Sequence, residues 1–221
     1  ATFLDRTDVD KKLERRSRVG SGQVNYWRID VAFDPDGFSP WDTLWYDGDE
    51  GDLDPLCSQM KLGAIWSPPR VRIERRLKRP DVYGLHLFLA VNDKVRRLVS
   101  DIGVEELELL PLTVTRARRL YVLHSTARFN LDYDASCPGN APHDNISAVT
   151  RWVFPQELAR SNLSVFQAFQ APGSAARDAG FPLDPVFVSQ SIKYRLELAG
   201  VAGIAFYPVS ISSRERGVRR T

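Results

Sequence analysis

The chain has 221 residues, 43% of them hydrophobic, and carries 30 lysines and arginines against 28 aspartates and glutamates. A chain of this length can bury enough apolar surface to fold without a disulfide framework, a structural metal or a membrane, and its composition excludes collagen and disordered proteins. The formal net charge of +2 is too small for general attraction to polyanions, so nucleic acid is not the expected partner of the chain as a whole.

The sequence also bears on where the protein works. Residues 1–18 alternate acidic and basic side chains and lack the apolar stretch of a secretory signal. Nowhere does the sequence approach the roughly 20 consecutive apolar residues of a bilayer-spanning helix. Cys57 and Cys137 lie in unrelated sequence contexts, which favours two reduced thiols over a disulfide. We therefore expect a cytoplasmic protein with no membrane partner.

Residues 1–80 predict a β-rich region that carries one acidic, aromatic loop. Residues 23–33 combine β-forming side chains with partial alternation, and the turn-forming residues 34–37 follow them. In residues 41–54, three aromatic side chains and five acidic ones that follow them stand out, with glycines between these acids and no apolar periodicity, which indicates an exposed loop. These eight residues are Trp41, Trp45, Tyr46, Asp47, Asp49, Glu50, Asp52 and Asp54.

A basic run closes this region. Residues 62–66 predict a short strand that ends at two prolines, and the densest group of basic side chains in the chain follows. The group comprises Arg70, Arg72, Arg75, Arg76, Lys78 and Arg79. We interpret it as a solvated, salt-bridged strand edge, because charged residues commonly protect sheet edges against pairing. Pro80 then marks the predicted boundary between residues 1–80 and residues 81–221, and one continuous domain is the alternative.

Two similar strand–helix–strand units stand out after residue 81, at about residues 88–114 and 185–211. In each unit an apolar strand meets a capping residue, Asn92 or Ser189, and a helix with apolar residues on one face follows. The two copies are expected to form a pseudo-symmetric pair.

The ends of these units also follow one plan. Both helices are predicted to stop at a glycine, Gly103 or Gly200, because glycine tolerates the left-handed conformation that often ends a helix. Each unit then returns to a strand that reaches a proline, Pro111 or Pro208, and we expect those ends at a sheet edge or a bulge. With further strands predicted between the units, the sequence indicates an α+β protein with a mixed β-sheet and few helices.

A catalytic role finds little support in the sequence. It contains no typical nucleotide-binding, hydrolase or zinc-protease motif, and its three histidines show no metal-ligand spacing. Asp132 and Asp134 have the residue type of a general acid–base pair, but a local turn explains them equally well. An enzyme that uses Asp132, Asp134 or His124 stays an alternative. We expect no catalytic residue, no cofactor and no metal.

The apolar units and the strands between them resemble a known family. Residues 88–136 contain FLAVNDKVRRLVSDIGVEELELLPLTV, LYVLH and LDYDAS, and the C-terminal unit reads VFVSQSIKYRLELAGVAGIAFYPV. These stretches resemble the myxococcal-type immunity proteins of bacterial polymorphic toxin systems. The resemblance covers most of residues 85–211 and is most specific over residues 188–209. It implies a non-enzymatic cytoplasmic protein that binds a cognate toxin, encoded by a neighbouring gene, and blocks it.

A tight inhibitor needs aromatic or arginine anchors and complementary charge at its interface. The acidic, aromatic loop provides both, so we predict that this loop is the partner-binding surface and that it enters a basic cleft of the toxin. The alternative is a protein that binds nucleic acid or another anionic ligand. That protein would use the basic run and the C-terminal arginines Arg214, Arg216, Arg219 and Arg220.

Overall fold

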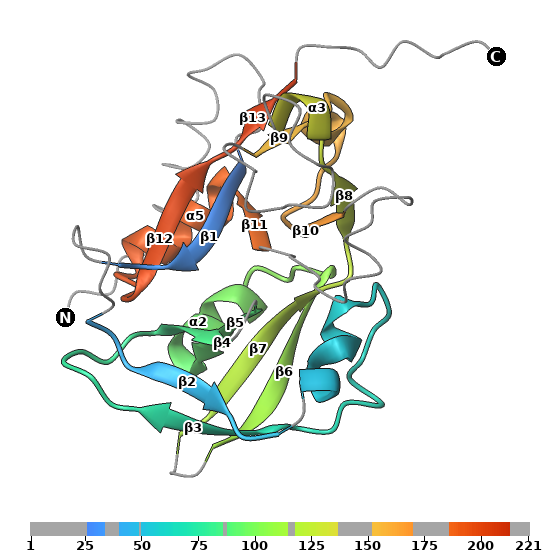
Figure 1. Ribbon diagram of the computed structural model, residues 1–221. Coiled ribbons are helices and arrows are strands. Elements are labelled where there is room, and N and C mark those ends of the chain that lie inside the picture. Colours follow the sequence, from blue (N-terminus) through green and yellow to red (C-terminus); the bar gives the residue numbers. More distant parts are fainter. Residues whose placement is uncertain are drawn as a thin grey trace.

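The computed structural model (Figure 1) describes residues 26–33, 40–48, 50–85, 88–114, 118–136, 152–169 and 186–212. Mixed β-sheets dominate the fold and short helices pack against them, which confirms the predicted α+β class. In chain order the elements are β1 (Tyr26–Val31), β2 (Thr43–Tyr46), the 3-10 helix η1 (Glu50–Cys57), β3 (Arg70–Glu74), β4 (Val82–Leu85), β5 (Phe88–Asn92), α2 (Asp93–Ser100), β6 (Leu107–Val114), β7 (Leu120–Ser125), β8 (Arg128–Asn130), α3 (Tyr133–Ser136), β9 (Val153–Phe154), α4 (Glu157–Arg160), β10 (Val165–Phe169), β11 (Val186–Ser189), α5 (Gln190–Leu198), β12 (Ile204–Pro208) and β13 (Ser210–Ile211).

The lower sheet in Figure 1 has the strand order β2-β3-β6-β7-β5-β4. Its two outer strands, β2 and β4, also contact each other, so the sheet curls into a nearly closed barrel. Successive side chains of a strand point to opposite faces, and the inward row of β7 contains Leu120 and Val122. The helix η1 adds Leu53 and Leu56, which are 4% and 0% exposed, to this barrel core.

The upper sheet has the strand order β12-β1-β11-β10-β8. Its apolar face, the outer face of the lower sheet and the helices α2 and α5 share a second core. The strand β5 belongs to both cores, because Phe88 and Ala90 face the barrel while Leu89 and Val91 face the upper sheet. This position explains why the sequence of β5 is apolar without alternation.

Strands from residues 1–80 join both sheets. β1 pairs antiparallel with β11 and with β12, and β3 pairs parallel with β6. Strands from both sides of residue 80 are therefore hydrogen-bonded to each other within the same sheets. A third cluster packs rings against the far face of the upper sheet, where Phe166 and Phe187 stack with their centroids 5.0 Å apart.

The helix signals of the sequence are largely confirmed. The Asn92 side chain accepts hydrogen bonds from the N–H groups of Lys94 and Val95, at 3.0 and 3.2 Å, and so caps α2. Gly200, with a φ of 59°, directly follows the C-cap of α5, as predicted. Gly103 has a φ of 70° but lies two residues beyond Asp101, the C-cap of α2. In the part of the chain that is described, no helix combines the length and apolar character needed to cross a membrane.

The second cap and one of the prolines differ from the prediction. Ser189 precedes α5, but its hydroxyl oxygen lies 2.9 Å from that of Ser191 and makes no capping bond. Pro208 does end an edge strand, β12. Pro111 lies inside β6, between β3 and β7, and β3 pairs with β6 only at Thr113 and Val114. The missing N–H of Pro111 therefore costs no bond to β3.

Predictions for the segment before residue 70 are wrong in two places. Residues 62–66 form turns rather than a strand, and the N–H of Ile65 bonds back to the carbonyl of Leu62 at 2.8 Å. Much of the expected acidic loop is the helix η1, whose Leu53 and Leu56 are three residues apart, the period of a 3-10 helix. Finally, β3 lies between β2 and β6, so the basic run does not begin at a sheet edge.

Candidate binding site

Pairing of β2 with β3 brings together two segments that the sequence presents as separate surfaces. The strands are antiparallel, with Thr43 opposite Glu74, Trp45 opposite Arg72 and Tyr46 opposite Val71. Side chains directly opposite each other on one face of such a pair are close enough to interact. The acidic, aromatic segment and the basic run therefore contribute to a single surface, which we call the β2–β3 face.

Trp45 is the centre of the β2–β3 face. It is 54% exposed, and its indole N–H donates a 2.6 Å hydrogen bond to Glu74 Oε2. The guanidinium carbon of Arg72 lies 6.0 Å from the ring centroid, and Arg72 Nε lies 3.3 Å from Asp47 Oδ1. The hydrogen bond from Trp45, followed by the positive charge of Arg76, lowers the pKa of the Glu74 carboxyl. The exposed indole thus has charged neighbours of both signs.

The other predicted site residues divide between this face and the interior. Trp41 is half-buried and forms an isolated bridge with Lys78, whose ammonium lies 5.6 Å from the ring centroid. Tyr46 is half-buried and packs against the barrel core, and Asp54 is exposed on η1. Asp49 lies outside the described residues, as do the side chains of Glu50 and Asp52.

Ion pairs neutralise part of the basic run. Arg72 pairs with Asp47, and Arg76 Nη2 lies 3.9 Å from Glu74 Oε2. Arg70 is exposed on the same face of β3, and its side chain forms no ion pair or hydrogen bond with the residues that the structure describes. The four C-terminal arginines lie outside those residues.

An open pocket of about 680 Å³ lies next to the β2–β3 face. One side is the end of β2 with the residues after it, and the other is the irregular segment that leads into β3. Its lining includes Tyr46, Asp47, Leu62, Ile65, Trp66 and Arg70. Ile65 is 68% exposed and so presents an aliphatic side chain at the pocket. The pocket therefore combines rings and aliphatic groups with charges of both signs.

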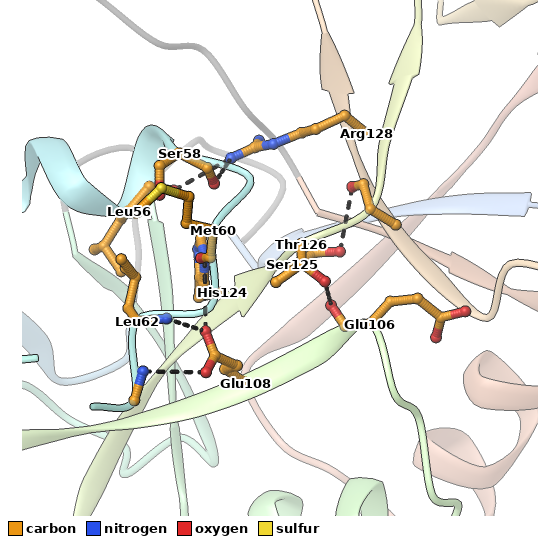
Figure 2. Close-up of polar contacts among 12 residues, drawn as sticks. Leu56, Ser58, Met60, Leu62, Glu106, Glu108, His124, Ser125, Thr126 and Arg128 are labelled. Carbon is orange, nitrogen blue, oxygen red and sulfur yellow. Dashed lines mark hydrogen bonds and ion pairs between the residues drawn. The ribbon is translucent and has the colours of Figure 1, made fainter. Parts of the chain in front are cut away.

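Side chains fix residues 56–69, which we call the wall segment, to the barrel (Figure 2), and Leu62 and residues 65–69 of this segment line the pocket. Arg128 Nη2 donates to the carbonyls of Leu56 and Ser58, at 3.3 and 3.0 Å. Glu108 accepts the N–H groups of Leu62 and Gly63, at 2.7 and 3.1 Å. An irregular segment cannot satisfy these backbone groups itself, so the sheet supplies their partners.

Between these two anchors lies His124, which is fully buried on β7 directly opposite Glu108 on β6. Its Nε2 donates to the carbonyl of Met60 at 3.0 Å and lies 3.8 Å from Glu108 Oε2. A carbonyl only accepts, so the Nε2 atom carries a proton in this arrangement. Nδ1 is buried and makes no hydrogen bond with the described residues. His124 thus holds the wall segment from inside the barrel.

The end of the wall segment is anchored in the same way. Trp66 Nε1 donates to the carbonyl of Pro111 at 2.8 Å. Thr113 donates its N–H to Pro69, at 3.0 Å, and its hydroxyl to Pro68, at 3.3 Å. Contacts from β6, β7 and β8 therefore reach the wall segment along most of its length. The sequence analysis missed this arrangement, because its only sequence signal is polar residues on otherwise apolar strands.

Asp132 has a local structural role: its carboxylate accepts the N–H of Ala135 at 3.3 Å at the start of α3, in the kind of turn that the sequence suggests. The Asp134 side chain lies outside the described residues. Within the described ranges, no three His, Cys, Asp or Glu side chains gather as a metal site requires.

The fold and the site thus define an α+β protein that presents an exposed indole beside an open, rigidly walled pocket. No protein-family model matches the chain, and no curated protein matches it. The resemblance of its sequence to immunity proteins stays a prediction.

Proposed function

We propose that the protein is a non-enzymatic immunity protein that binds a cognate protein toxin in the cytoplasm and neutralises it as a stoichiometric complex. The observation that carries this proposal is the exposure of Trp45, at 54%, on a strand pair beside an open pocket. Tryptophan is enriched among the few residues that dominate binding energy at protein interfaces. An indole has only two side-chain torsions to order on binding, so tryptophan supplies a large contact area at a low cost in entropy.

The charged side chains around Trp45 resemble the polar rim of a protein–protein interface more than a binding site for polyanions. Arg72, Asp47 and Glu74 surround the indole with both signs of charge, as the polar rim of a protein interface does. The exposed Asp54 fits the predicted steering toward a basic toxin surface. The alternative ligand, a nucleic acid, is less favoured because Arg72 and Arg76 already have acidic partners.

The experiment is capture of the tagged protein from its native host, followed by size-exclusion chromatography at moderate salt. We expect one protein partner to co-elute in simple stoichiometry and to be toxic when it is expressed alone. The protein eluting alone, or with nucleic acid that salt removes, would contradict the proposal.

A pair of variants locates the interface. Trp45→Ala should weaken the complex at least about 30-fold, since truncation of a central aromatic anchor commonly costs about 2 kcal/mol or more. Phe33→Ala is the matched control, because Phe33 is also 54% exposed but follows a strand of the other sheet. Isothermal titration of the purified partner should find the control within threefold of the unaltered protein. Equal affinity for both variants would place the interface elsewhere.

A further inference from the structure

The pocket beside the β2–β3 face has a preformed shape. Glu108 and His124 of the barrel form hydrogen bonds to the wall segment, and Trp66 of the wall segment forms one to the barrel. These hydrogen bonds are 2.7 to 3.1 Å long. On the opposite side, the Tyr46 ring lies beside the backbone of Gly48 and packs against the barrel core. A ligand that enters such a pocket pays little for ordering the protein.

The lining of the pocket favours an extended segment with an apolar side chain. Tyr46 and Trp66 supply rings, and the prolines at 55, 68 and 69 supply a surface without N–H donors. The Trp66 indole N–H is already bonded to the carbonyl of Pro111, so this ring offers the pocket its apolar surface. Its volume of about 680 Å³ lies within the range of sites that hold ligands of several residues or a small molecule.

Among the described residues, the charge that remains available in the pocket is positive. Two charged side chains of the described part of the chain line it, and one of them, Asp47, pairs with Arg72 at 3.3 Å. The other is Arg70, which is exposed and whose side chain has no ion pair or hydrogen bond to the described residues. A carboxylate is the group that a guanidinium fork recognises best in a protein ligand.

We propose that this pocket binds a short extended segment of a protein partner, in which an apolar side chain occupies the pocket and an adjacent carboxylate pairs with Arg70. This inference rests on the proposed function for the identity of the partner as a protein. It adds a recognition element of opposite sign to the exposed Asp54 on η1: Asp54 would face basic groups of the partner, whereas the pocket would bind an acidic one.

The test uses the full chain, labelled with ¹⁵N, and two synthetic peptides as probes. The peptides are acetyl-Ala-Phe-Glu-Leu-Ala-amide and the same sequence with Gln in place of Glu. We expect the Glu peptide to shift the amide signals of residues 46–48 and 62–70, and the Gln peptide to bind roughly fivefold more weakly. Shifts confined to other residues, or equal affinities for both peptides, would overturn the proposal.

Two variants assign the charge effect to one side chain. In Arg70→Gln the fivefold preference for Glu should disappear, because the neutral amide has no charge to pair with the carboxylate. In Arg79→Gln the preference should persist, since Arg79 is an exposed arginine of the same run that does not line the pocket. A preference that survives Arg70→Gln would show that general attraction, rather than the pocket, selects the acid, and would overturn the proposal.

The peptide measurement needs no toxin, so the two proposals fail separately. If a partner co-elutes from the host and Trp45→Ala releases it, while neither peptide reaches the pocket, this inference is wrong and the proposed function stands. If the Glu peptide binds as expected but no protein partner is found, the pocket is established and the proposed function is wrong.

Discussion

The wall segment and the corner where α2 meets α5, which comprises residues 81, 92–94 and 200–202, both contain backbone outside a regular sheet. Side chains hold the backbone in place in both regions, but their arrangement differs. At the corner, a single carboxylate is the centre: Asp81 accepts hydrogen bonds from Asn92 Nδ2, Lys94 Nζ and the N–H of Ala202, at 2.7, 2.8 and 2.9 Å. Lys94 also donates to the carbonyl of Gly200 at 2.8 Å. The wall segment instead depends on side chains spread over β6, β7 and β8.

This difference predicts how the stability of each region should respond when a side chain is removed. A corner with one central group loses several contacts when that group is removed, whereas a segment with distributed anchors loses them one at a time. The corner should therefore fail as part of the whole fold, and the wall segment should loosen locally. Three predictions probe this contrast.

The largest effect is expected at the corner. Asp81→Ala removes the shared acceptor and leaves the Lys94 ammonium and the N–H of Ala202 without their carboxylate partner. We expect a loss of about 2 kcal/mol in the free energy of unfolding, measured by urea denaturation. Asp101→Ala is a suitable control, since Asp101 is an exposed carboxylate at the other end of α2. A loss at Asp81 no larger than that of the control would contradict the central role of this carboxylate.

A smaller and more local effect is expected in the wall segment. Glu108→Ala removes one anchor of several, so we expect a loss of about 1 kcal/mol in the free energy of unfolding. Hydrogen exchange should accelerate at the amides of Leu62 and Gly63 while exchange at the corner stays unchanged. Glu105→Ala, at an exposed glutamate just before β6, is the matched control and should alter neither. Faster exchange throughout the molecule would show that the wall segment is not a separate unit.

The smallest effect concerns pH. Burial, the largest single influence on Asp81, raises its pKa, but the hydrogen bonds from Lys94, Ala202 and Asn92 and the charge of Lys94 together outweigh it, so the pKa is lowered below its ordinary value of 3.8. A carboxyl with a lowered folded-state pKa stabilises the fold above its unfolded-state pKa, and this stabilisation is lost as pH falls through the folded-state value.

The unaltered protein should therefore be more stable than Asp81→Asn by a constant amount above about pH 5, and the difference should shrink at lower pH. Urea denaturation of the two proteins from pH 7 to pH 3 measures it. The comparison removes the contributions of Glu74 and Asp93, whose pKa values are also lowered, because both proteins contain them. A difference that is independent of pH would contradict the ionised state of Asp81 as the source of the stabilisation.

The contrast between the regions also explains what the sequence could predict. The helix α2 has its cap, its apolar positions and its terminal glycine within twelve residues, from Asn92 to Gly103, so local rules suffice to locate it. The wall segment follows no local rule. Leu62, Ile65 and Trp66 suggest a strand, but the partners of this backbone are Glu108 and His124, which a reading of neighbouring residues does not connect to it.

The candidate site shows the same limit. Trp45 and Asp47 are recognisable as exposed candidates from the polar composition around them. Their contact with Arg72 depends on the register of β2 against β3, and the pocket depends on the path of the wall segment. Sequence reasoning therefore singled out Trp45 and Asp47 as candidates, but it treated as two surfaces the two segments that strand pairing joins into one.

The strand order of the upper sheet has a consequence for synthesis of the chain on the ribosome. Every strand of the lower sheet falls between Thr43 and Ser125, whereas β1 pairs with strands that begin at Val186 and Ile204. The ribosome adds roughly 5 to 20 residues per second, so on the order of ten seconds pass between the synthesis of β1 and that of its neighbouring strands. During that time it is an unpaired edge, the type of surface at which growing chains aggregate. Chaperone demand should therefore be greatest after the barrel has closed and before β11 emerges.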